Sequence, residues 1–81
     1  MYTIIKGMIK IDSLEIMESL SEIVNDTSKY EGQHVVNEEE DYIEIDDIDI
    51  KCLSELLKQG FLTETEFTAA SQVDLIKFYL D

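Results

Sequence analysis

The chain has 81 residues, with six lysines, no arginine, nineteen acidic residues and a formal net charge of −13. This length predicts one domain spanning residues 1–81. The charge excludes direct binding to nucleic acid, which needs a basic face, and it disfavours anionic membrane surfaces. No apolar run approaches the ~20 residues that span a membrane. The single cysteine, Cys52, excludes an intrachain disulfide and suits a reducing compartment, so we expect a cytoplasmic protein.

The N-terminal part of the chain predicts a strand followed by a helix. Residues 2–11 are rich in isoleucine, a β-branched residue that favours extended backbone. Asp12 or Ser13 is placed to cap a helix that should run to about Asp26. At helical spacing, apolar side chains gather on one side of this segment: Ile16, Met17, Leu20, Ile23 and Val24.

The middle of the chain predicts a hairpin. His34–Val36 and Tyr42–Ile45 are short strand candidates, separated by a turn over residues 37–41. In the second strand Ile43 and Ile45 alternate with Tyr42 and Glu44, which is the pattern of a half-buried strand. Tyr42 should therefore face outward among acidic neighbours, where it could stack on an arginine of a partner.

The C-terminal part predicts two helices and one ambiguous segment. Asp49 is placed to cap a helix that Gly60 ends in a left-handed conformation, and Thr63 with Glu66 forms a capping box for the next helix. Residues 73–80 fit either a helix, which we favour, or a strand. The order β-α-β-β-α-α predicts an α+β domain with a small antiparallel sheet backed by helices.

Two acidic clusters stand out. Eight of the twelve residues from 38 to 49 are carboxylates, with no lysine among them. A second set lies along the first predicted helix, opposite its apolar side. Like charges at this spacing destabilise a helix, so the excess indicates binding to a basic partner rather than stability. The predicted partner-binding residues are Glu38, Glu39, Glu40, Asp41, Tyr42, Glu44, Asp46, Asp47, Asp49, Glu15, Glu18, Glu22 and Asp26.

In its size, charge, lack of arginine and clustering of carboxylates, the chain resembles small, very acidic phage-encoded proteins that mimic nucleic acid. Members of this class include anti-CRISPR and anti-restriction inhibitors. The resemblance is one of class and involves no sequence motif, so it transfers no residue roles. It implies a non-enzymatic protein of the host cytoplasm. Such a protein, a monomer or small homo-oligomer, would block the basic nucleic-acid-binding site of a host defence protein.

Two other resemblances leave alternatives open. Asp12–Glu18 is similar to the D-S-L-[DE]-x-x-E stretch of acyl carrier proteins, which implies phosphopantetheine on Ser13, although no helix is predicted before it. Leu53–Phe67 is similar to the SHOCT helical hairpin, an oligomerisation module. It implies an assembly adaptor that self-associates through its C-terminal hairpin.

The sequence carries no recognisable catalytic or metal-binding motif. Asp46, Asp47 and Asp49 lack the spacing and glycine of an EF-hand loop. His34 is the single histidine, so no zinc ligand set can be assembled with Cys52. No nucleophile triad or glycine-rich phosphate loop is present. We therefore expect no enzymatic activity, no cofactor and no bound metal.

Overall fold

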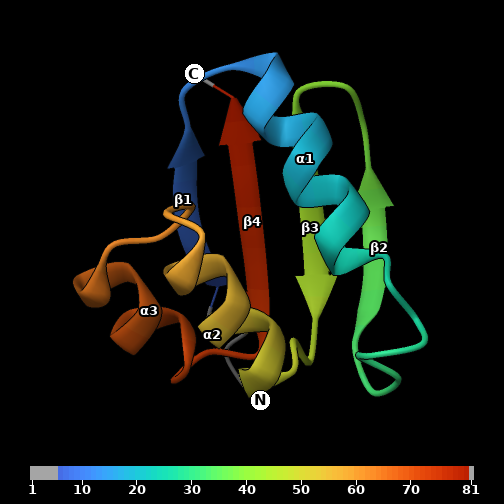
Figure 1. Ribbon diagram of the computed structural model, residues 1–81, viewed down its shortest axis with the longest axis vertical. Coiled ribbons are helices and arrows are strands. Elements are labelled where there is room, and N and C mark those ends of the chain that lie inside the picture. Colours follow the sequence, from blue (N-terminus) through green and yellow to red (C-terminus); the bar gives the residue numbers. More distant parts are fainter. Residues whose placement is uncertain (1–5, 81) are drawn as a thin grey trace, which may run out of the picture.

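The computed structural model describes residues 6–80, which form four strands and three helices (Figure 1). The α+β class predicted from the sequence is confirmed. The first strand is seen from Lys6 onward, and the rest of its predicted range lies outside the described residues. In chain order the elements are β1 (Lys6–Ile11), α1 (Leu14–Val24), β2 (His34–Glu38), β3 (Tyr42–Asp46), α2 (Ile50–Lys58), α3 (Glu64–Ala70) and β4 (Leu75–Leu80).

The C-terminal segment is a strand in the middle of the sheet. The strand order is β1-β4-β3-β2, with β4 parallel to β1 and antiparallel to β3. The sheet is therefore mixed, not purely antiparallel, and the helix that we favoured for residues 73–80 is wrong. Ile76 and Phe78 are fully buried while Lys77 and Tyr79 are half-buried, so side chains alternate across the strand.

All three helices lie against one face of the sheet (Figure 1). The core forms between this face and the helices. The sheet contributes Ile9, Ile11, Ile43, Ile45, Ile76 and Phe78, and the helices contribute chiefly Met17, Leu20, Val24, Cys52, Leu53 and Leu56. Within residues 6–80 no helix or strand covers the other side of the sheet, which we call the open face.

The predicted helix caps are present. The Ser13 hydroxyl accepts a hydrogen bond from the Ile16 amide, and the Asp49 carboxylate accepts one from the Lys51 amide. The capping box of Thr63 and Glu66 is complete. Helix α1 ends at Val24, slightly earlier than expected.

One buried polar side chain joins three parts of the fold. The Gln33 amide nitrogen donates to the Val24 carbonyl at 2.7 Å, and its oxygen accepts from the Asp49 amide at 3.0 Å. These bonds hold the segment before β2 against the end of α1 and the start of α2. Cys52 lies beside Gln33, and burial raises the pKa of its thiol to about 11, so the thiol stays neutral.

The end of α2 depends on a glycine. Gly60 has φ +88, while the amides of Gly60 and Phe61 donate to the carbonyls of Leu57 and Leu56, forming a Schellman motif. Side chains other than glycine rarely adopt this φ.

We expect Gly60→Ala to lower the free energy of unfolding by about 1 kcal/mol, because alanine is strained in the left-handed region. Gly32→Ala is the matched control: Gly32 also has open space around its Cα but no positive φ. It should leave stability unchanged or raise it slightly. Urea denaturation measures both variants, and equal effects of the two would contradict this assignment.

Candidate functional site: an acidic hollow between α1 and the β2–β3 hairpin

The fold divides the acidic run into three groups. Glu38 ends β2, and residues 39–41 form the turn of the β2–β3 hairpin. Glu44 and Asp46 lie on the open face, since they alternate with the buried Ile43 and Ile45. Asp47 and Asp49 follow β3 at its opposite end, before α2. The run from 38 to 49 therefore does not form one continuous acidic surface.

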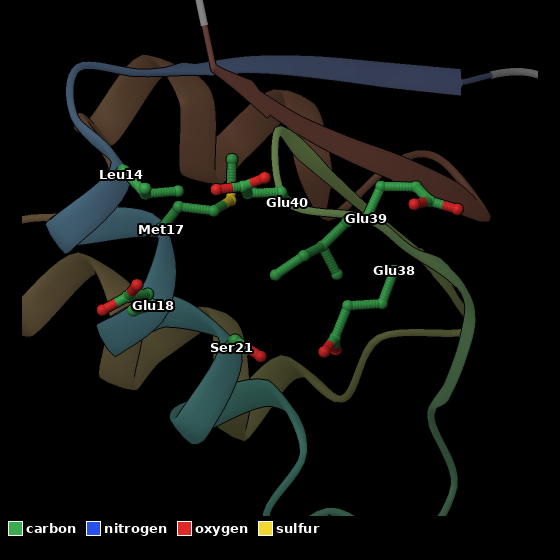
Figure 2. A pocket seen from close by; sticks show the side chains of 8 residues that line it. Leu14, Met17, Glu18, Ser21, Glu38, Glu39 and Glu40 are labelled. Carbon is green, nitrogen blue, oxygen red and sulfur yellow. The ribbon is translucent and has the colours of Figure 1, made fainter.

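The first group meets helix α1 across a hollow of about 350 Å³ (Figure 2). This acidic hollow carries four carboxylates, contributed by both predicted clusters. Its floor is apolar, and no lysine lines it. Its eight lining residues are Leu14, Met17, Glu18, Ser21, Glu38, Glu39, Glu40 and Ile43.

The carboxylates of the hairpin differ in direction. In Figure 2 the side chain of Glu38 points toward α1 near Ser21, that of Glu40 lies near Met17, and that of Glu39 points away from α1. The Asn25 side-chain nitrogen donates to Glu38 Oε1 at 2.8 Å. This bond joins the end of α1 to the end of β2 and so fixes one wall of the hollow against the other.

The predicted stripe on α1 does not act as one unit. Of its four members Glu18 alone lines the acidic hollow, whereas Glu15 lines a separate depression beside Gly60 and Phe61. Glu22 is exposed on the helix. Asp26 lies beyond the helix end and accepts hydrogen bonds from the Ser28 hydroxyl and amide, and the hydroxyl bond is the main cause that lowers the pKa of Asp26.

Several other predicted site residues have roles within the chain. The Asp49 carboxylate caps α2, and Asp47 takes the left-handed conformation at φ 53. Asp41 lines a shallow depression with Leu14 and Leu80. Tyr42 is half-buried on the open face, where Lys77 Nζ lies 4.4 Å from the centre of its ring. The ring predicted to stack on a partner's arginine thus already contacts a cation of its own chain.

The sequence did not reveal the apolar part of the hollow. In the sequence, Met17 and Ile43 fit the apolar sides of a helix and a strand, and nothing in this spacing indicates a shared hollow. The helical spacing on α1 predicts an inward side, and Met17, Leu20 and Val24 on it are buried, whereas Ile16 is 39% exposed. This spacing does not show that the hairpin turn rises beside the first two turns of this helix.

The structure bears on the two alternative functions, the acyl-carrier-like protein and the assembly adaptor. The Ser13 hydroxyl caps α1, and the four-stranded sheet is not the helical bundle implied by the carrier resemblance, so modification of Ser13 stays an untested prediction. In the predicted helical hairpin, Leu53 and Leu56 are buried in the chain's own core. The apolar side that would drive self-association is therefore already covered.

Comparisons with protein-family models, curated proteins and solved structures give no match. Across residues 6–80, no three side chains of His, Cys, Asp or Glu are placed to hold a metal ion together. Over the same range, no helix has both the length and the apolar character to cross a membrane. The acidic hollow is thus assigned from geometry and charge alone.

We expect replacing Glu18, Glu39 and Glu40 with glutamine to stabilise the fold at low salt, because it relieves repulsion between carboxylates around one hollow. The melting temperature should rise by about 1–3 °C, and added salt should shrink the difference. Thermal unfolding followed by circular dichroism measures both effects. A lower melting temperature in the variant would show that these carboxylates support the fold.

Proposed function

We propose that the protein is a non-enzymatic inhibitor that mimics nucleic acid and occupies the basic nucleic-acid-binding site of a host defence protein. It would act in the manner of anti-CRISPR or anti-restriction proteins, in the host cytoplasm. The observation that carries the proposal is the meeting of carboxylates from α1 and from the hairpin at one hollow without a lysine among its lining residues.

The charge of the protein supports a basic partner. A net charge of −13 on 81 residues exceeds the magnitude of ~2–8 that suffices for the solubility of a small domain. Such a field accelerates association with a basic groove and makes binding weaken as salt rises. DNA presents one charge per ~3.4 Å of rise in each strand, so a groove lined with lysine and arginine accepts clustered anions of either origin.

The shape of the hollow supports the same partner chemistry. Lysine and arginine combine an apolar stem with a charged head. Leu14, which is 37% exposed, offers an apolar surface for the stem, and the surrounding carboxylates offer acceptors for the head. The hydrogen bond from Asn25 to Glu38 holds one acceptor in place before binding, which reduces the ordering cost of association.

A pull-down from bacterial lysate at low and high salt, with duplex DNA as a competitor, tests the proposal. We expect the protein to recover nucleic-acid-binding proteins with basic surfaces, and both DNA and salt should release them. Recovery of a neutral or acidic partner that resists salt would contradict the proposal.

Two triple variants with the same net charge locate the binding surface. Replacing Glu18, Glu39 and Glu40 with glutamine should reduce recovery about tenfold, because losing three exposed ion pairs of about 0.5 kcal/mol each costs about 1.5 kcal/mol. The matched control replaces Glu31, Glu64 and Asp74, exposed carboxylates outside the hollow, with their amides. Equal losses in both variants would show that total charge, not the hollow, determines binding.

A further inference from the structure

The open face of the sheet is where lysines gather beside apolar and aromatic side chains. Lys10 on β1 and Lys77 on β4 lie on it, together with Met8, which is 56% exposed, and the half-buried Tyr79. Glu44 and Asp46 on β3 balance these two lysines. On a protein with a net charge of −13, this face is close to neutral, and repulsion between two molecules is weakest there.

The charges divide the open face into two halves. The lysines lie on β1 and β4, and the carboxylates of Glu44 and Asp46 lie on β3. The midline between β4 and β3 separates the halves. A twofold axis along this midline, parallel to the strands, places the basic half of one copy opposite the acidic half of another. An axis perpendicular to the strands instead places the acidic halves opposite each other.

The strand register determines which side chains of the two copies lie opposite each other. Lys77 and Glu44 are cross-strand partners at one level, so the twofold axis along the midline sets Lys77 of one copy opposite Glu44 of the second. Lys10 lies level with Tyr79 and Tyr42. At this level the same axis sets Tyr79 of one copy opposite Tyr42 of the second.

We propose that two copies of this chain associate through their open sheet faces, about a twofold axis parallel to the strands. Each interface contains two symmetric pairs of Lys77 with Glu44 on the central strands, next to contacts between Tyr79 and Tyr42, with Met8 on the outer strand. Such self-complementary surfaces are the usual basis of twofold dimers, and aligned packing of two sheets is a common arrangement. The helices of both copies, with their acidic hollows, then face outward.

The area of the open face limits the affinity with which two copies associate. Four strands about 4.8 Å apart and about six residues long span roughly 19 by 20 Å. Such a face covers roughly 400 Å² per copy in projection, which is smaller than the roughly 800 Å² per partner of a standard interface. We therefore expect a weak dimer, with a dissociation constant on the order of 100 μM.

Sedimentation equilibrium of the whole chain from about 5 to about 500 μM tests the proposal, since this range brackets the expected dissociation constant. We expect a monomer–dimer equilibrium. Lys77→Glu should weaken it about tenfold, because it replaces two symmetric attractive pairs with repulsive ones. The double variant Lys77→Glu/Glu44→Lys restores complementarity and should restore dimerisation. Circular dichroism confirms that each variant is folded.

Lys58→Glu is the matched control, since it makes the same charge change at an exposed position on α2. It should leave the dissociation constant within about twofold of the original. A wild-type chain that stays monomeric throughout the range overturns the proposal. So does an equal effect of Lys58→Glu and Lys77→Glu, or a folded double variant that fails to dimerise.

Discussion

The structure depends on the insertion of β4 between β1 and β3. The N-terminal strand pairs only with β4, and the hairpin joins the rest of the sheet only through β4, so without it no continuous sheet exists among the described residues. Ile76 and Phe78 anchor this strand, and both are fully buried beneath the helices. Burying two large apolar side chains contributes several kcal/mol, which is comparable to much of the stability of a small domain. The residues nearest the C-terminus thus organise the whole domain.

The arrangement of the strands also determines on which side of the sheet the carboxylates lie. Alternation along β3 directs Ile43 and Ile45 to the helices and Glu44 and Asp46 to the open face. The hairpin turn carries the remaining carboxylates beside α1, where they meet Glu18 at the acidic hollow. A sequence run that is nearly uniform in charge is thus divided between the acidic hollow, the balanced open face and the segment before α2. The acidic hollow and the open face lie on opposite sides of the sheet, so binding at one leaves the other accessible.

Local signals in the sequence predicted most of the elements, and packing decided the rest. The caps at Ser13, Asp49 and Thr63 and the glycine end of α2 are governed by hydrogen bonds within a few residues, so they could be read directly. The conformation of residues 75–80 could not be predicted in this way, because their apolar residues suit either a covered helix or a central strand. Only pairing with β1 and β3 favours the strand. The acidic clusters were visible in the sequence. Their separation, and the apolar floor contributed by Leu14 and Met17, depend on tertiary contacts.

The central claim is that the acidic hollow, and not the net charge alone, binds basic side chains. Two-dimensional NMR of the isotope-labelled protein, titrated with a short arginine-rich peptide, tests it residue by residue. We expect saturable shifts of backbone amide signals concentrated around Glu18, Ser21 and residues 38–40, where stems and guanidinium groups would lie. Shifts of equal size at Glu31, Glu64 and Asp74 would contradict the claim, since they would show general attraction to an anionic surface.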